Sequence, residues 1–389
     1  MISSIGSISF IDRINQHYTS KRSSKELAKQ AKLFIGAVAA SPKVIPQWLR
    51  RFEFDLDLFL RTLLECVPTS LSRRYVASAI LGCIAGEWHC SESVENLREL
   101  ALNWFGHLFW TFKSAGADGM LATSDDVLHH YIREAVLRRE GYRCLVTGVY
   151  DWQRAQRHQV PKANMDYACI LPRTARPDHS RDDAKRSIHD YFSPASWDIF
   201  QHYMSVAIDD EEVLLDELES PANAVAMELD AGYSFQQFYF SLETCPGQVP
   251  DNHVIVPYDH EISDLCAIAP LQDRISLYGQ MAAGDSISTP SPLFLQIHAT
   301  IAKVLYFSRA GIVIDRINDY LGQNHPVLQR LDFESARMTL ELNDSVEKMF
   351  ANLGKEKKRE SESESESDGT RCKKFEASVR RELKRRKLV

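Results

Sequence analysis

The sequence lacks any long apolar run and any closely paired cysteine motif. No stretch of 18 apolar residues occurs, so we expect no membrane-spanning helix and no membrane partner. The eight cysteines include no C-x-x-C pair, which argues against a zinc ribbon, and their scatter argues against a disulfide framework. The first residues lack the charged-then-apolar order of a secretory signal. These absences predict an intracellular protein.

Most of the chain also lacks an excess of basic residues. The 389 residues carry a formal net charge of −7. Residues 354–389 contain 13 Lys+Arg and 8 Asp+Glu, a net of +5, which leaves −12 for residues 1–353. An acidic body argues against tight nonspecific DNA binding through the globular part. A hydrophobic content of 44% and a charged content of 25% are ordinary for globular proteins and exclude a fully disordered chain.

Hydrophobic periodicity predicts an α+β fold with a mostly helical N-terminal region at residues 1–115. Apolar residues recur three and four positions apart in 24–41, where Ser24 is the expected cap, and again in 73–86 and 92–113. We interpret these stripes as core packing and not as a cofactor pocket. Further helices are expected at 127–140, 182–204, 292–308 and 336–353. Residues 311–353 are expected to form a region of C-terminal helices.

Short apolar runs bounded by Gly and Pro predict strands at 142–148, 167–172, 224–228, 238–243 and 254–258. The last two flank a Pro-Gly pair and so predict a hairpin. Residues 173–219 form an insertion that includes the helix at 182–204, and the sequence gives no role for it.

Residues 354–389 are rich in Ser, Glu, Lys and Arg, and we expect them to be disordered. The basic cluster formed by Lys384, Arg385, Arg386 and Lys387 is a candidate nuclear-import signal or nucleic-acid tether. The alternating Ser-Glu stretch before it is typical of acidic kinase substrates, where phosphorylation would add negative charge beside the basic end.

Three pieces of the middle region occur in an informative order. Residues 138–148 read R-R-E-G-Y-R-C-L-V-T-G, residues 168–172 read A-C-I-L-P, and S-P-A-N at 220–223 is followed by F-Q-Q-F-Y-F at 235–240. The ordered set resembles the HNH nuclease family, in particular the HNH-like domains numerous in fungal proteins. Residues 291–305 are similar to a helix that follows the motif in those proteins. On this resemblance we place an HNH-like domain at 124–310, with its motif core at 138–243.

The resemblance implies a ββα unit that holds one divalent metal ion, such as Mg²⁺, and hydrolyses DNA phosphodiesters. In that family a histidine on the first strand acts as general base on water. An asparagine fixes the loop and orients that histidine, and a histidine on the helix helps hold the metal. The metal stabilises charge on the scissile phosphate and the leaving oxygen.

Carrying these roles over gives a mixed result. The general-base position falls on Cys169, the asparagine is retained as Asn223, and the metal-ligand position falls on Gly232, which has no side chain. Asp230 is a speculative substitute ligand. A thiol with a reference pKa of ~8.5 is mostly protonated at pH 7, and its thiolate is too soft a ligand for Mg²⁺. Loss of a general base costs on the order of 10²–10⁴ in rate. We therefore expect hydrolysis to be absent or strongly impaired.

Other polar residues in this region have simpler interpretations. Asp178 and His179 form an acid–histidine pair that lies beyond the end of the second predicted strand, where a solvated loop is the favoured interpretation. His129 and His130 are adjacent and therefore point to different sides of a helix. Cys144 is interpreted as a buried thiol and Gly148 as a turn glycine.

Arg138, Arg139 and Arg143 are candidate phosphate-binding residues beside the first predicted strand. The alternative interpretation is a solvated helix face. Three functions remain open from the sequence: a metal-dependent DNA endonuclease with unusual residues, a catalytically silent HNH-like module that binds nucleic acid or protein, and a helical interaction module.

Overall fold

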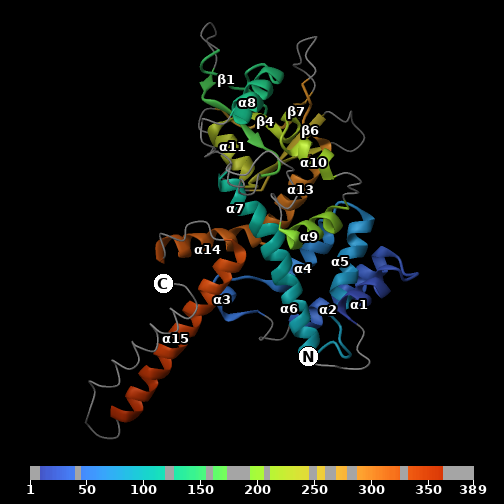
Figure 1. The fold of residues 1–389 in the computed structure, drawn as a ribbon, viewed down its shortest axis with the longest axis vertical. Coiled ribbons are helices and arrows are strands. Elements are labelled where there is room, and N and C mark those ends of the chain that lie inside the picture. Colours follow the sequence, from blue (N-terminus) through green and yellow to red (C-terminus); the bar gives the residue numbers. More distant parts are fainter. Residues whose placement is uncertain are drawn as a thin grey trace. The chain divides into compact units, whose positions relative to one another are not determined.

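The computed structural model describes residues 9–39, 45–118, 127–154, 161–172, 193–205, 211–244, 252–258, 269–277, 287–324 and 332–361. The protein is α+β, with many helices and a few small sheets (Figure 1). The chain divides into two compact units, Met1–Ala336 and Arg337–Val389. The Asp178–His179 pair and the basic cluster at 384–387 lie outside the described residues.

Helices form the N-terminal part of the first unit: α1 (Phe10–Tyr18), α2 (Ser24–Ala39), α3 (Gln47–Arg50), α4 (Leu56–Glu65), α5 (Ser70–Gly82) and α6 (Ser91–Trp104). α1 and α2 pack on α5, and α2 also packs on α4. α2 begins as predicted at Ser24, but the cap is Ser23, whose hydroxyl accepts from Glu26 N while the Glu26 carboxylate accepts from Ser23 N at 2.7 Å. This reciprocal arrangement satisfies two donors that the first helical turn leaves open.

The helix predicted at 92–113 is confirmed, but it contains an interruption. α6 runs into a π-helical turn, η1 (Phe105–Trp110), and continues as α7 (Thr111–Asp118) (Figure 1). Gly106 lies in this turn, where a Cβ atom would overlap the ring of Phe333. α6 contacts α4 and α5, whereas α7 contacts a helix of the mixed region, so this one element links the helical and mixed parts of the first unit.

The mixed region begins with α8 (Val127–Arg139) and has three small sheets. β1 (Tyr150–Asp151) pairs with β2 (Lys162–Ala163) in parallel, and β3 (Met165–Cys169) pairs with β4 (Ala224–Glu228) antiparallel. β5 (Phe240–Thr244), β6 (Asn252–Pro257) and β7 (Arg274–Ser276) form an antiparallel sheet, so the predicted hairpin is confirmed. Between them lie α9 (Pro194–Met204), α10 (Glu211–Leu218), a 3₁₀ turn η3 (Pro221–Asn223) and α11 (Leu229–Gln236).

The strand predicted at residues 142–148 is wrong. This segment is a series of turns with a single bridge between Arg143 and Tyr150. Gly148 has a φ of +76°, and its N–H donates to Cys144 O at 3.0 Å. The left-handed backbone at Gly148 reverses the chain before a strand can extend, as the predicted role of Gly148 as a turn glycine requires.

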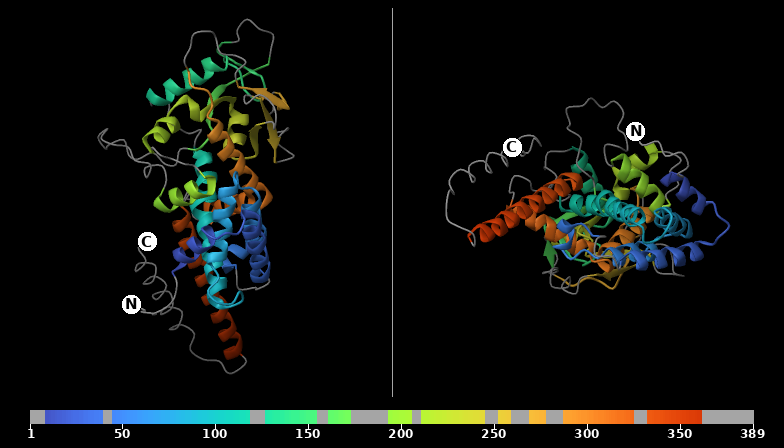
Figure 2. Two further views of the ribbon diagram at one scale, coloured as in Figure 1. Left: turned by 90° about the vertical axis from the view of Figure 1, so that its right-hand side faces the viewer. Right: turned by 90° about the horizontal axis from the view of Figure 1, so that it is seen from below.

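Three helices follow the last sheet: α13 (Pro292–Phe307), α14 (Ala310–Asn324) and α15 (Phe333–Ser361). α13 is strongly buried and packs on β5, α4 and α14. Figures 1 and 2 show α15 as one continuous helix. The prediction of disorder from residue 354 is therefore wrong for 354–361, where Lys, Glu and Arg, all good helix formers, continue the helix.

Of the described helices, none is long and apolar enough by itself to cross a membrane. Pro292–Phe307 and Ala310–Gln323 reach that length and composition together, but as a pair bent by 77°.

Candidate functional site

The candidate site is built on two antiparallel strands followed by a helix. β4 leads directly into α11, and α11 packs against both β3 and β4. Cys169 is the last residue of β3 and pairs with Ala224, the residue after Asn223. The structure thus brings Cys169 and Asn223 together although they are far apart in sequence. Gly232 lies on α11, the helix that covers this pair of strands, and is buried.

Asn223 is fully buried and uses its side chain to join two backbone segments. Its Oδ1 accepts from Leu171 N at 2.8 Å, and its Nδ2 donates to Leu171 O at 3.0 Å and to Leu218 O at 3.1 Å. Its own carbonyl accepts from Ile170 N at 2.9 Å. These bonds fix the chain beyond Cys169 against the turn that enters β4. Both N–H donors of the amide are therefore used by backbone carbonyls inside the protein.

The start of α11 carries two carboxylates with different surroundings. Asp230 is exposed in the first turn, whereas Glu228, at the N-cap, is only 1% exposed. In the part of the chain that the structure describes, Glu228 Oε1 has no hydrogen-bond partner. Burial, and then the charge of Asp230, raise the pKa of Glu228. The sequence does not single out Glu228, because it holds no signal that distinguishes this buried glutamate from a solvated one.

The side chains at these positions do not fit a hard divalent cation. Mg²⁺ and Ca²⁺ take several oxygen ligands, whereas the positions expected to serve the metal hold a buried thiol, a glycine and the exposed Asp230. Among the described residues, no three or more His, Cys, Asp or Glu side chains are grouped so as to hold a metal ion.

Two phenylalanines of the motif do pack as a pair. Phe235 on α11 and Phe238 just after it enclose His298 of α13, with centroid distances of 3.9 Å and 4.6 Å and nearly parallel rings. The Nε2 atom of His298 lies 3.0 Å from Phe235 O, and the imidazole is only 1% exposed. Burial lowers the pKa of His298 to about 3. This imidazole is therefore neutral at pH 7 and holds α13 against α11.

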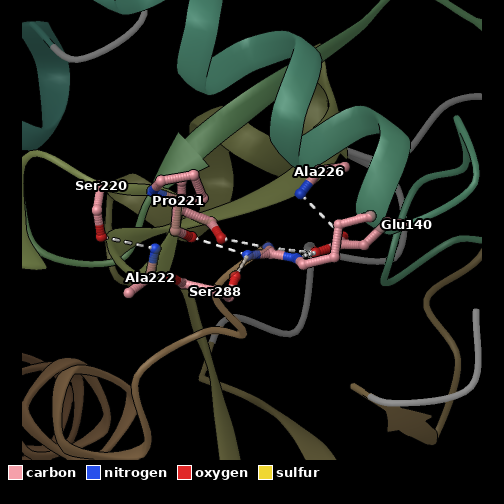
Figure 3. Close-up of polar contacts among 8 residues, drawn as sticks. Glu140, Ser220, Pro221, Ala222, Ala226 and Ser288 are labelled. Atoms are coloured by element: carbon pink, nitrogen blue, oxygen red, sulfur yellow. Dashed lines mark hydrogen bonds and ion pairs between the residues drawn. The ribbon is translucent and has the colours of Figure 1, made fainter. Parts of the chain in front are cut away.

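Arg139, a candidate phosphate-binding residue in the sequence, is buried inside the protein and does not lie on a solvated helix face. It is 3% exposed, and all five of its N–H donors are used. They reach Glu140 Oε1 twice and the carbonyls of Pro221, Ala224 and Ser288 (Figure 3). A phosphate would have to displace these bonds.

Glu140 completes this buried network. Its Oε2 accepts from Ala226 N at 3.0 Å, so the Arg139–Glu140 pair holds the end of α8 on β4 (Figure 3). Burial raises the pKa of Glu140, and the adjacent Arg139 opposes that shift. Removing one partner of such a pair leaves an uncompensated buried charge, which typically costs ~3–5 kcal/mol.

The other residues that the sequence singled out in this region differ in exposure. Arg138 is exposed, and Arg143 is half-buried, with Nε donating to Gly148 O at 2.7 Å. Cys144 is buried, and burial raises the pKa of its thiol. His129 lies 5.0 Å from the Tyr167 ring on β3, whereas His130 is exposed, so the two histidines point apart as expected.

Comparison with known proteins adds no family assignment. No family model matches the chain, and neither a curated protein nor a solved structure matches it.

Proposed function

We propose that this chain is an HNH-like protein that has kept the ββα scaffold, has lost efficient phosphodiester hydrolysis and serves as a binding module for nucleic acid or protein. The observation that carries the proposal is the division of the motif by role. The retained residues Asn223, Phe235 and Phe238 all make buried structural contacts. The replaced positions, Cys169 and Gly232, are those at which the family resemblance requires a base and a metal ligand.

The chemistry at Cys169 supports this proposal. The residue is 4% exposed, and burial in apolar surroundings disfavours the thiolate, which is the form of a cysteine that could accept a proton from water. Gly232 has no side-chain atom that could bind a metal. Asp230 is exposed and offers a single carboxylate as a ligand. Because function depends on the side chains in a site and not on the fold, the scaffold alone does not support cleavage.

A plasmid-nicking assay with Mg²⁺ or Mn²⁺ tests the proposal. We expect the purified full chain to nick supercoiled DNA no faster than the buffer control does. Cys169→Ala is the matched variant, because it removes the thiol and changes little else. Metal-dependent nicking by the wild type that disappears in Cys169→Ala would overturn the proposal.

A gain-of-function variant tests the placement of the site. We expect Cys169→His combined with Gly232→His to bind Mn²⁺ detectably by calorimetry, whereas the wild type does not. Each single variant is the control, because one imidazole is a weak site. If the folded double variant binds no metal, the ββα assignment of these residues is wrong.

A further inference from the structure

A small basic pocket lies between the turns after α8 and strand β7. It has a volume of about 180 Å³, and its polar lining includes Arg143, Gln272 and Arg274. Gln272 N donates to Val146 O at 2.8 Å, which fixes the segment before β7 to the turn that contains Arg143. The two sides of the pocket are therefore held together by the backbone.

Gly148 leaves room for the side-chain nitrogens of two residues that line this pocket. A Cβ atom at Gly148 would lie 2.8 Å from Arg143 Nη2 and 3.1 Å from Gln272 Nε2, so both nitrogens lie beside the bare Cα. The φ of +76° also disfavours other residues there. Glycine thus opens a space that is faced by a guanidinium and a side-chain amide.

The charge of the pocket is positive and uncompensated. Arg143 uses Nε for Gly148 O, and its guanidinium lies 5.4 Å from the centre of the Tyr150 ring. Its terminal nitrogens, like the whole Arg274 side chain, have no hydrogen-bond or ion-pair partner among the residues that the structure describes. The lining has one carboxylate, Glu140, which is neutralised by Arg139. Two guanidiniums therefore face the space without an anion.

Guanidinium groups with free terminal nitrogens bind phosphate through paired hydrogen bonds. The pocket is smaller than the ~300–1,000 Å³ typical of sites for whole small molecules. It therefore fits one phosphate group of a larger ligand, the remainder of which lies outside.

An exposed aromatic ring lies close to the pocket. Arg143 is bridged to Tyr150, and two residues further along is Trp152, whose side chain is 64% exposed. Two residues of extended chain span about 7 Å. Lys162 Nζ lies 5.8 Å from the centre of the indole ring. Exposed aromatic rings next to a basic groove are the usual features of single-strand binding, since unpaired bases stack on them.

We propose that the Arg143–Gln272–Arg274 pocket binds a backbone phosphate of a single-stranded nucleic acid and that Trp152 stacks on an adjacent base. The inference rests on the proposed function, because it takes the strand to be bound and not cut. It differs from the family's metal site, since none of Cys169, Asn223 and Gly232 lines the pocket and no metal is involved.

Fluorescence anisotropy of the full chain with a labelled dodecamer of thymidine at low salt tests this inference. We expect Arg274→Gln and Arg143→Gln each to weaken binding about three- to tenfold, and the double variant to lower the salt slope by about 1–2. Arg274→Gln is the more informative single variant, because the side chain has no partner within the described residues and its removal should not affect folding. Trp152→Ala should weaken oligonucleotide binding about tenfold.

Arg309→Gln is the matched control, because it removes one exposed positive charge from the same unit away from the pocket. The basic C-terminal residues are present in every variant, so differences between variants report on the pocket. Equal affinity of wild type and double variant, or an equal loss in Arg309→Gln, would overturn the inference. Binding of inorganic phosphate without any binding of the oligonucleotide would also overturn it. Cleavage of the bound strand would instead refute the proposed function and leave the pocket intact.

Discussion

At the scale of single residues, Asn223 joins backbone segments on both sides of the candidate site. Its amide bonds Leu171, 52 positions away, through both a donor and an acceptor. A fully buried amide in this position is a structural requirement wherever the loop must be held, whether or not hydrolysis takes place.

Replacing Asn223 with Asp should destabilise the protein by about 2–4 kcal/mol. In the variant, a carboxylate oxygen replaces the Nδ2 donor and faces the Leu171 and Leu218 carbonyls, which are also acceptors. A buried polar group left without a partner costs about 1–3 kcal/mol, and more when it is charged. Urea denaturation followed by circular dichroism measures the change. Asn103→Asp, on the exposed face of α6, is the control and should shift stability by less than about 0.5 kcal/mol. Equal stability of the two variants would show that the Asn223 bonds are dispensable.

His298 should make the protein less stable as the pH falls. Its folded pKa is about 3, whereas an unfolded histidine has a pKa of ~6.5. Between these values the unfolded chain takes up a proton that the folded chain refuses, so stability declines by up to ~1.4 kcal/mol for each unit below about 6.5. His298→Gln keeps a donor toward Phe235 O but cannot titrate. Thermal melts from pH 7 to pH 4 should therefore show a shallower decline for the variant, and parallel declines would contradict a buried neutral imidazole.

At the scale of elements, Gly106 permits the π-helical turn to pack against Phe333. Gly106→Ala would place a methyl group in the ring, and overpacking of this kind typically costs ~1–3 kcal/mol. Gly322→Ala is the matched control, because no atom lies within 4 Å of the corresponding position in α14. There the substitution should stabilise by ~0.4–1 kcal/mol through lower entropy of the unfolded chain. Calorimetric melting temperatures should therefore move in opposite directions, and a shift in the same direction would argue against close packing at Gly106.

Elements with strong local signals were predictable from the sequence. Features that depend on how distant segments fold together were not. The span of β4 agrees with the prediction at both ends, and the starts of α2 and α13 also agree, because capping groups, Pro or apolar runs mark them. Residues 142–148 have a β-like composition, but the left-handed Gly148 makes a turn of them, which composition does not reveal. Arg143 and Arg274 share a pocket only because the segment before β7 folds back onto the turn. The sequence was enough to name Cys169 and Asn223 as site positions. It did not reveal that all the N–H donors of Arg139 are used in hydrogen bonds inside the protein.

At the scale of the whole molecule, positive charge is concentrated near the C-terminus of an otherwise acidic chain. Residues 362–389 contain 9 Lys+Arg and 6 Asp+Glu, a net of +3 out of a total of −7. The net negative charge of residues 1–361 repels polyanions. The pocket with Arg143 and Arg274 is positively charged only locally. A basic segment on such a body should raise the rate and strength of nucleic-acid association without regard to base sequence.

Deleting residues 362–389 should lower the affinity for the thymidine dodecamer about three- to tenfold at ~50 mM salt, and the loss should shrink at ~0.3 M salt, where screening is effective within a few ångströms. A chain whose residues 362–389 are shuffled at constant composition is the control and should bind as the wild type does, because the interaction depends on charge. The deletion should leave the melting temperature of the remainder within ~1 °C, since it removes no residue of the first unit. A deletion with unchanged affinity would show that residues 362–389 contribute nothing to binding. A shuffled chain that binds as weakly as the deletion would show that the contribution depends on the order of these residues and not on their charge alone.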